Sequence, residues 1–202
     1  MTTYPDIDAL HADLRRCRRC AEAGHPIDSP PIFSGAQTAR LFLIGQAPGG
    51  VEGESRLPFS GPSGKRLFRW LEQAGWREAE FRQRCYVSAV TKCFPGKHAN
   101  GRGDRVPTAA ERALCRPWLD AELALVAPEV IVPVGRLAIN LFYEDKPPLV
   151  DIVGSSKRHQ GRLVVPLPHP SGASAWTNDP ENQARVEQAL AILGALKEQL
   201  DL

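Results

Sequence analysis

The sequence predicts an α/β fold of three layers (αβα), in which helices cover both faces of a central, mostly parallel four-stranded sheet. Four short apolar runs, each suited to a buried strand, are spread along the chain. Amphipathic patterns long enough for helices lie between them, as in successive βαβ units. The 202 residues, 43% of them hydrophobic, are enough for one core, so we expect a single domain over residues 1–202.

The first predicted elements are a helix and a strand joined by irregular chain. Apolar residues recur at spacings of three and four over residues 6–20, which predicts an amphipathic helix that carries both cysteines of the segment. Residues 24–37 are rich in Gly and Pro and are typical of irregular chain. Residues 40–45 form the first apolar run and predict the first strand.

A helix, a strand and a long loop are predicted next. Ser63 is a suitable cap for a helix that runs through residue 73 and stops at Gly75. Residues 85–90 predict the second strand. Residues 91–106 contain three glycines and a proline, which indicates a loop rather than a helix or strand. This loop has the basic and imidazole side chains of Lys92, Lys97, His98, Arg102 and Arg105, and is the best candidate for a surface that contacts phosphates.

The second half of the chain repeats the pattern. Thr108 and Glu111 form a capping box that opens a helix to about residue 126. Residues 129–134 and 163–167 predict the third and fourth strands, with a short helix over 136–143 between them. An amphipathic helix over residues 182–200 closes the fold.

Composition limits the class of protein. No apolar stretch is long enough for a membrane helix, and the N-terminus lacks the pattern of a signal peptide, so we expect a cytoplasmic protein. The net charge of +2 is too small to indicate nucleic acid by itself, because affinity for DNA depends on local clusters of Lys and Arg.

The predicted sheet indicates where a site should lie. In parallel α/β sheets, ligands bind beyond the carboxyl ends of the strands. Here these ends carry residues 46–52, 88–93 and 169–171. We therefore expect the side chains of these three segments to meet in one site.

Four of the five cysteines suggest a metal site. Cys17 and Cys20 have the spacing that lets two thiols reach one metal centre, and Cys93 and Cys115 flank a loop whose ends could approach it. The spacing alone allows zinc, an iron–sulfur cluster or buried thiols without a metal. Cys85 starts an apolar strand and is expected to be a buried free thiol.

Six short motifs occur in an order that resembles a known family. They are Gly45-Gln46-Ala47-Pro48-Gly49, Arg56-Leu57-Pro58-Phe59-Ser60-Gly61, Thr91-Lys92-Cys93-Phe94-Pro95-Gly96, Cys115-Arg116-Pro117-Trp118-Leu119, Pro128-Glu129-Val130-Ile131-Val132-Pro133-Val134-Gly135 and His169-Pro170-Ser171. Together they resemble the iron–sulfur (family 4-like) uracil-DNA glycosylases. The resemblance implies a four-iron, four-sulfur (4Fe-4S) cluster on Cys17, Cys20, Cys93 and Cys115, and excision of a damaged base from DNA by base flipping.

The resemblance also implies roles for individual residues. Glu52 falls on an acid of the family's first motif and would hold or polarise the attacking water. His169 matches the histidine that donates to the uracil O2 as negative charge builds on the leaving base. Phe59 matches the aromatic ring on which the flipped base stacks. The residues implied around the base are Gln46, Ala47, Phe59, Ser88 and Ala89.

Two positions depart from the family pattern. Gln46 replaces the first acid of the first motif, and Ala89 replaces an asparagine that reads the edge of uracil. Ser88 or Gln46 could compensate, but neighbouring side chains on a strand point to opposite faces, so Ser88 would have to be reoriented. Two alternatives to uracil excision remain open: a glycosylase for hypoxanthine or xanthine, and a lesion-binding protein on the same fold that has lost catalysis.

DNA is the expected partner, bound by a monomer. The long basic loop is expected to contact it through Lys97 and its neighbours. After His169-Pro170-Ser171 the sequence departs from the family's aromatic-leucine pattern, so Trp176 is the candidate for the wedge that fills the vacated base stack. Four arginines beside the first two cysteines either meet phosphates or are simply solvated. The expected DNA contacts are Lys92, Lys97, Arg102, Ser171 and Trp176.

Overall fold

The computed structural model describes residues 3–27, 29–101, 103–172 and 175–201. In these ranges the elements are α1 (Ile7–Arg15), α2 (Arg19–Glu22), β1 (Leu41–Gly45), α3 (Gly50–Ser55), α4 (Pro62–Gln73), α5 (Glu78–Arg84), β2 (Tyr86–Ala89), α6 (Ala109–Val126), β3 (Val130–Pro133), α7 (Arg136–Ile139), α8 (Leu149–Ile152), β4 (Lys157–His159), β5 (Arg162–Val164), the 3₁₀ helix η1 (Ala175–Asn178) and α9 (Pro180–Gln199). No helix in the described ranges is long and apolar enough to cross a membrane.

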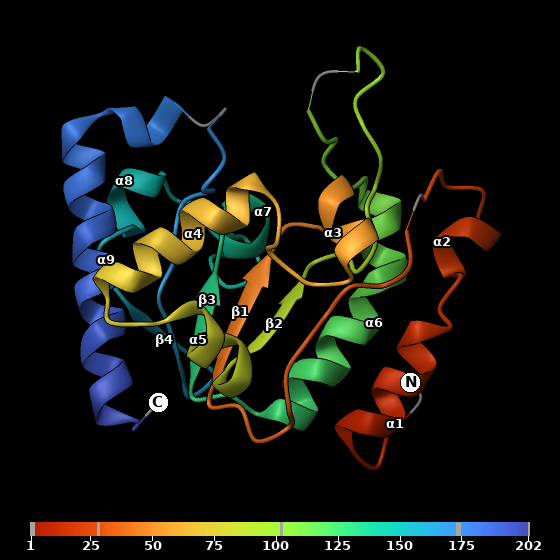
Figure 1. Ribbon diagram of the computed structural model, residues 1–202, viewed down its shortest axis with the longest axis horizontal. Helices are drawn as coiled ribbons and strands as arrows, with labels where there is room; N and C mark the ends of the chain where they lie inside the picture. The colour runs from red at the N-terminus through yellow and green to blue at the C-terminus, as the bar shows by residue number, and fades with distance from the viewer. Residues whose placement is uncertain (1–2, 28, 102, 173–174, 202) are drawn as a thin grey trace.

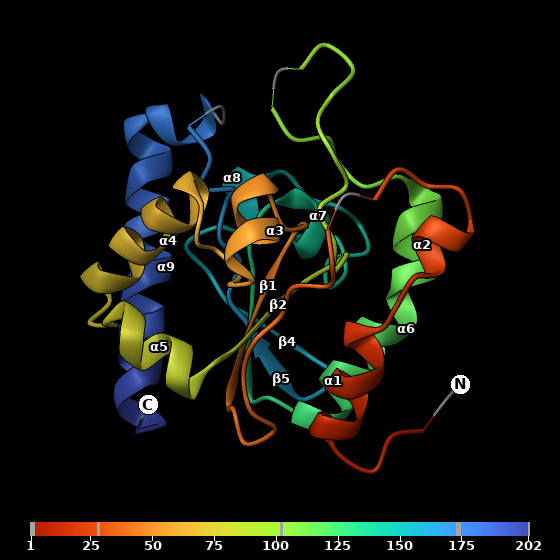
Figure 2. The same cartoon turned by 45° about the vertical axis from the view of Figure 1, so that its right-hand side comes forward.

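Helices lie on both faces of a central sheet, as predicted. The strand order is β2-β1-β3-β5-β4, and every pairing is parallel except that of β4 with β5. Figure 2 shows α4, α5 and α9 on one side of the sheet and α1 and α6 on the other. The αβα class is therefore confirmed.

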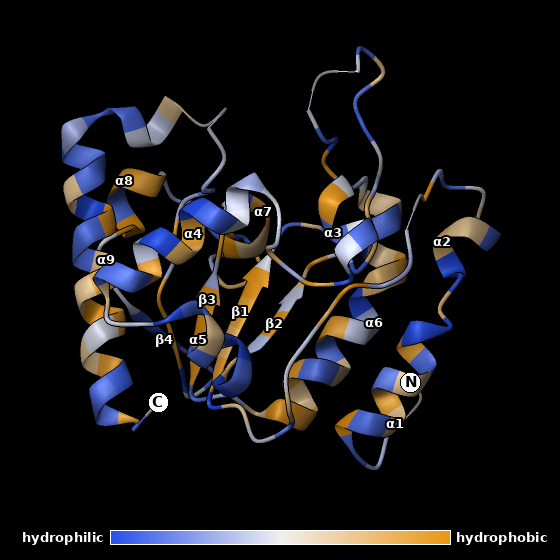
Figure 3. Ribbon diagram, viewed as in Figure 1, coloured by the Kyte–Doolittle hydropathy of each residue, from blue (hydrophilic) through white to orange (hydrophobic). Residues whose placement is uncertain are grey.

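The strand alternation explains the three layers. Leu41 and Leu43 of β1 point into a core with α4, α5 and α9, whereas Phe42 and Ile44 point into a second core with α1 and α6. Both sets of side chains are at most 1% exposed. Because both faces of β1 are buried, the strand has the continuous apolar sequence of a parallel sheet, and β1 and its neighbour β3 are coloured as hydrophobic in Figure 3.

The prediction of four strands was wrong by one. β4 is a three-residue polar edge strand, Lys157-Arg158-His159, antiparallel to β5. Its turn is formed by Gln160 and Gly161, whose φ angles are 49° and 82°. Two positive φ angles are typical of the tight turns that join hairpin strands. An exposed edge strand has no need of an apolar run, so hydrophobic pattern alone missed it.

The predicted first helix is also divided. α1 ends at Arg15, and α2 is a separate short helix, so Cys17 lies between them while Cys20 lies in α2. The short helices α3, α5 and α8 fall in segments for which no helix was predicted. The predicted fourth strand ends early as β5, although Leu167 still forms a parallel bridge with Val134.

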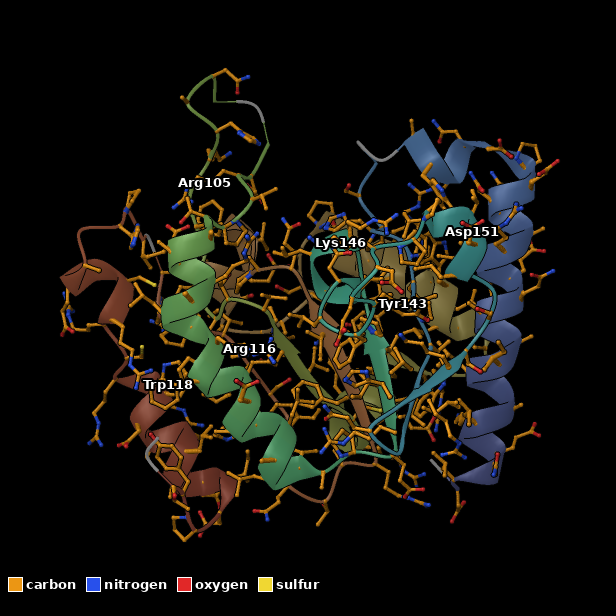
Figure 4. The ribbon with its side chains drawn as sticks, turned by 180° about the vertical axis from the view of Figure 1, so that it is seen from behind. Arg105, Arg116, Trp118, Tyr143, Lys146 and Asp151 are labelled. Carbon is orange, nitrogen blue, oxygen red and sulfur yellow. The ribbon has the colours of Figure 1, made fainter. Side chains whose placement is uncertain are left out.

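The carboxyl ends of β1, β2 and β3 point to the same end of the domain as α3 and the long loop between β2 and α6 (Figure 1). Beyond its base, this loop extends away from the domain. Arg105 lies at that base, next to the start of α6 (Figure 4). The segments expected to form a site therefore do gather at one end of the sheet.

Candidate active site and cysteine cavity

A cavity of about 480 Å³ lies at the carboxyl ends of the central strands. It is lined by both predicted catalytic residues, all the predicted base-binding residues and one predicted DNA contact: Glu52, His169, Gln46, Ala47, Phe59, Ser88, Ala89 and Ser171. Its size is within the range of small-molecule sites. The structure thus brings together side chains that are up to 125 positions apart in the sequence.

Glu52 is positioned by two backbone N–H groups. Its carboxylate accepts from the Gly49 N–H at 3.1 Å and from the Gly61 N–H at 3.2 Å. The first bond caps α3, and the second joins α3 to the loop before α4. The side chain is buried, and a carboxylate has about four acceptor positions, so lone pairs remain for a water molecule in the cavity.

Phe59 is held in an unusual backbone conformation. Its φ is 54°, a left-handed value that costs free energy in any residue with a side chain. The ring lies against Gly45, where a Cβ atom would stand 2.7 Å from the ring Cζ. The absence of a side chain at Gly45 therefore makes room for an aromatic face at the end of β1.

His169 is a neutral hydrogen-bond donor in this structure. Burial lowers the pKa of His169 below its ordinary value. The Ser171 N–H donates to His169 Nδ1 at 3.2 Å, so Nδ1 acts as an acceptor and the proton of the neutral ring lies on Nε2. An N–H donor is thereby presented by a side chain of the cavity wall.

Ser88 keeps the orientation that its place on the strand predicts, and its hydroxyl does not replace the amide that is missing at Ala89. Its Oγ donates to the carboxylate of Glu122, at 3.1 Å to each oxygen, and is buried. Since this carboxylate lies on α6, the Ser88 hydroxyl faces away from the base-binding side of the strand. Gln46 is the side-chain amide that remains in the cavity wall beside Ala89.

The expectation that Lys92 contacts DNA was wrong. Its side chain is 1% exposed, and Nζ lies 2.7 Å from the Glu122 carboxylate and donates to the Ala89 carbonyl at 2.6 Å. A buried lysine is retained only with a partner, and Glu122 supplies it. The ammonium is therefore fixed inside the protein below the end of β2.

The other predicted DNA contacts have different positions. Lys97 is exposed in the long loop, and its backbone forms an isolated antiparallel β-bridge with the backbone of Asp104. Trp176 is only half-buried, but it packs against the core, and the cavity lining does not include it. This packing argues against its expected role as a wedge. Arg102 lies outside the described residues.

The base of the long loop contributes side chains that were not predicted to line this cavity, although His98 and Arg105 were expected on a phosphate-contacting surface. His98, Asp104 and Arg105 line the cavity. Arg105 forms a bidentate ion pair with the buried carboxylate of Glu111, at 2.7 and 2.5 Å, which holds the pKa of Glu111 at about 2. The capping box predicted Glu111, but no local signal indicated that Arg105 would return to it.

The four predicted ligand cysteines line a second cavity of about 570 Å³ beside α1, α2 and α6. Two of the sulfur atoms accept N–H bonds: the Trp118 indole donates to Cys17 Sγ at 3.2 Å, and the Lys92 backbone donates to Cys115 Sγ at 3.3 Å. Burial raises the pKa of Cys115 to about 11. Figure 4 shows Trp118 on the side of α6 that faces the N-terminal segment.

Among the described residues, the four thiols are not arranged as a site for a single metal ion. Within the described part of the chain, no three His, Cys, Asp or Glu side chains are placed to hold a metal ion. The four cysteines surround a space, whereas a single zinc ion needs its sulfur ligands about 2.3 Å from one point. Cys85, by contrast, is fully buried in the opposite core, as expected for a free thiol.

The four arginines between the end of α1 and the start of α2 lie at the same cavity. Arg15, Arg16, Arg18 and Arg19 are all part of its lining. Arg19 stacks over Trp118 at 4.6 Å, and Arg16 pairs with Asp13 at 2.6 Å. Positive charge therefore gathers around the thiols.

Comparison with known proteins identifies the family. The model of the uracil DNA glycosylase superfamily matches residues 32–194. A type-4 uracil-DNA glycosylase of Thermotoga maritima is 31% identical over 142 residues, 69% of either chain. A type-4 enzyme of Pyrobaculum aerophilum is 25% identical over 161 residues, 79% of this chain and 76% of that one. A type-5 enzyme of the same organism is 32% identical over 136 residues, 62% of this chain and 55% of that one. The chain therefore belongs to the uracil DNA glycosylase superfamily and is related to its type-4 members.

Proposed function

We propose that this protein is a DNA-repair N-glycosylase that excises uracil, or a related deaminated base, from DNA. The observation that carries the proposal is the single cavity in which Glu52, Phe59 and His169 meet. Its relatives of types 4 and 5 bear the name uracil-DNA glycosylase. A base in duplex DNA must leave the stack to reach such a cavity, so the reaction requires base flipping.

The chemistry follows from the three side chains. In hydrolysis of the N-glycosidic bond, the bonding electrons leave with the base, a water oxygen bonds to the sugar carbon, and the proton that this water loses neutralises the departed base. The Nε2–H of His169 is the donor for the base oxygen on which negative charge develops, a contact that strengthens as the bond breaks. Glu52 holds the attacking water and favours the positive charge that builds on the sugar.

Phe59 provides a flat surface for the flipped base. Stacking of a base on an aromatic ring is worth about 1–3 kcal/mol and does not depend on the identity of the base. Recognition of the base edge must therefore come from polar groups. Ala89 has none, and the Ser88 hydroxyl is bonded to Glu122, so Gln46 is the side chain that we propose reads the edge.

The lack of a polar side chain at Ala89 favours a second candidate, a glycosylase for hypoxanthine or xanthine. The observation behind it is the methyl group of Ala89 at the place where the family pattern has an asparagine amide. A site that lacks this amide discriminates less strongly in favour of uracil. The two candidates share the fold and the reaction and differ in substrate.

We also propose that the four thiols of the second cavity hold a 4Fe-4S cluster. The donor set fits: Cys17, Cys20, Cys93 and Cys115 surround one space, and two of them already accept N–H bonds, which tune thiolate-bound iron. When bound, the cluster would supply four cross-links rather than a step of the hydrolysis. These would join the N-terminal segment, the loop after β2 and α6.

DNA is the proposed partner, and the protein is proposed to act as a monomer in the cytoplasm. The cavity is lined by residues of one chain, so a second copy is not needed to complete it. Lys97 in the long loop and the arginines of α1 and α2 are exposed or half-buried charges available to phosphates.

The decisive experiment is excision of uracil, hypoxanthine and xanthine from single- and double-stranded DNA by the wild type, Glu52→Gln, His169→Asn and Ala89→Asn. We expect His169→Asn to lose about 100-fold or more in kcat, as for other removed oxyanion donors, and Glu52→Gln to lose a similar factor because it removes the carboxylate that holds the attacking water. Ala89→Asn should raise the preference for uracil over hypoxanthine. DNA binding without cleavage of any base by the wild type would contradict the proposal and favour the lesion-binding alternative.

A further inference from the structure

The buried environment of Phe59 includes a residue that no motif assigned. Arg82 on α5 donates to two successive carbonyl oxygens, that of Pro58 at 2.8 Å through Nη1 and that of Phe59 at 3.2 Å through Nη2. The side chain is 14% exposed. It therefore contacts the backbone of the residue that lines the cavity, but not the cavity itself.

Arg82 is itself fixed on its other sides. Its Nε donates to Glu78 Oε1 at 2.9 Å, one turn earlier in α5. The guanidinium carbon lies 4.4 Å from the centroid of the Phe68 ring, in the range of a cation–π contact. A planar guanidinium has five donors in a rigid fork, so two acceptors at fixed positions can be held at once.

The backbone conformation of Phe59 requires contacts of this kind to stabilise it. Its φ of 54° is unfavourable for a residue with a Cβ atom and persists only where surrounding contacts over-determine it. On the side of α4, the backbone passes so close to Gly64 that a Cβ there would stand 1.8 Å from the Phe59 carbonyl oxygen. Gly64 makes room for this backbone, and Arg82 bonds it.

We propose that Arg82 is a positioning residue for base binding: it holds the Pro58–Phe59 backbone in the left-handed conformation that sets the Phe59 ring against Gly45 in the cavity wall. The inference rests on the proposed function, because it assigns the ring of Phe59 to stacking on the flipped base. Arg82 acts through Phe59 and does not touch the substrate.

Arg82→Met keeps the length of the side chain and removes the donors, and Arg82→Lys keeps one charge without the fork. The matched control is Arg84→Met on the same helix, where the arginine donates to the carbonyl of Asp201 instead. We expect Arg82→Met to raise KM about tenfold and to change kcat less, since loss of stacking weakens base binding. Arg82→Lys should recover only part of the loss, and Arg84→Met should match the wild type.

A direct measurement of the position of the Phe59 ring uses ¹⁹F NMR. With 4-fluorophenylalanine at position 59, the ¹⁹F resonance should shift or broaden in Arg82→Met and remain unchanged in Arg84→Met. In a Phe59→Ala background, Arg82→Met should add less than about a twofold effect, because residues that act through one group are not additive. An equal effect of Arg82→Met with and without Phe59, or an unchanged ¹⁹F resonance, would overturn the inference.

These outcomes are separate from failure of the proposed function. If the wild type excises a base and Phe59→Ala raises KM, the function stands whatever Arg82 does. If the wild type excises no base, the proposed function fails, and the ¹⁹F experiment still reports whether Arg82 holds the ring.

Discussion

At the scale of single residues, the polar groups of Ser88 and Lys92 are bonded inside the protein, whereas Glu52 and His169 line the cavity. Glu52, Phe59 and His169 were predicted to meet and do line one cavity. Ser88 and Lys92 were placed correctly along β2 and its following loop, but both turn to Glu122. Glu122 is 30 residues or more away on α6, and no local pattern marks it as their partner.

His11 gives a prediction on pH dependence. Its ring is buried beside Phe33 and its Nε2 lies 2.6 Å from the Tyr86 hydroxyl. Burial, assisted by the charge of Arg15, lowers the pKa of His11 from 6.5 to about 4. Between these two values the unfolded chain binds the proton and the folded chain does not, so stability falls as the pH falls from 6.5 to 4.

The expected loss is about 3 kcal/mol in the free energy of unfolding, by the linkage of pKa to stability. Urea denaturation of the wild type and of His11→Gln at several pH values from 8 to 4 measures it. Between pH 6.5 and pH 4, the free energy of unfolding of the variant should fall by about that much less than the free energy of unfolding of the wild type. The difference between the two proteins at pH 8 measures the stability lost with the other contacts of His11. Parallel curves for the two proteins would contradict the assignment to His11.

At the scale of elements, the predictions succeeded where hydrophobic burial determines the pattern. The buried strands β1 and β3 and the helices α4, α6 and α9 all lie at or near their predicted positions. The elements that were missed, α3, α5, α8, η1 and β4, are three to seven residues long. At that length a helix shows fewer than two turns of its period and an edge strand has little to bury, so tertiary contacts decide their conformation.

The pair of Lys92 and Glu122 is a fully buried polar link between elements. It joins the end of β2 to α6, and Glu122 also accepts from Tyr86 at 3.2 Å. Both charged side chains are at most 1% exposed. Removal of one partner leaves an uncompensated buried charge, so Lys92→Met should lower the free energy of unfolding by about 3–5 kcal/mol.

The double variant Lys92→Met/Glu122→Gln tests whether this cost comes from the pair. A neutral amide in place of the Glu122 carboxylate leaves no buried charge, so the double variant should be destabilised by less than the two single variants together. Urea unfolding at pH 7 measures all four proteins. Additive losses would mean that the two charges do not depend on one another.

At the scale of the whole molecule, the two cores share one sheet. β1 contributes Leu41 and Leu43 to one core and Phe42 and Ile44 to the other, so neither core can form without the same strand. We therefore expect residues 1–202 to unfold as one domain, in keeping with their prediction as a single domain. The segment around α2 is an exception, because none of the α2 residues is buried.

Loss of the proposed iron–sulfur cluster should make the segment around α2 unfold while the rest of the domain stays folded. α1 has its own anchors in Leu10 and Leu14, which are fully buried, whereas Cys17 and Cys20 lie in a segment that the proposed cluster would fix to α6. In Cys17→Ser/Cys20→Ser, the amides of residues 16–24 should lose their protection from hydrogen exchange while those of β1 and β3 keep it. Purified wild type should contain about four iron atoms per chain, and the double variant far less.

Cys85→Ala is the matched control, since Cys85 is buried in the opposite core. It should keep its iron and the protection of residues 16–24, with only the loss of stability expected from a smaller core side chain. Full iron content in Cys17→Ser/Cys20→Ser, or loss of iron in Cys85→Ala, would show that the ligands were assigned wrongly. Unchanged exchange after loss of iron would instead show that the N-terminal segment is held by packing, because the thiols would then close no cross-link on which its structure depends.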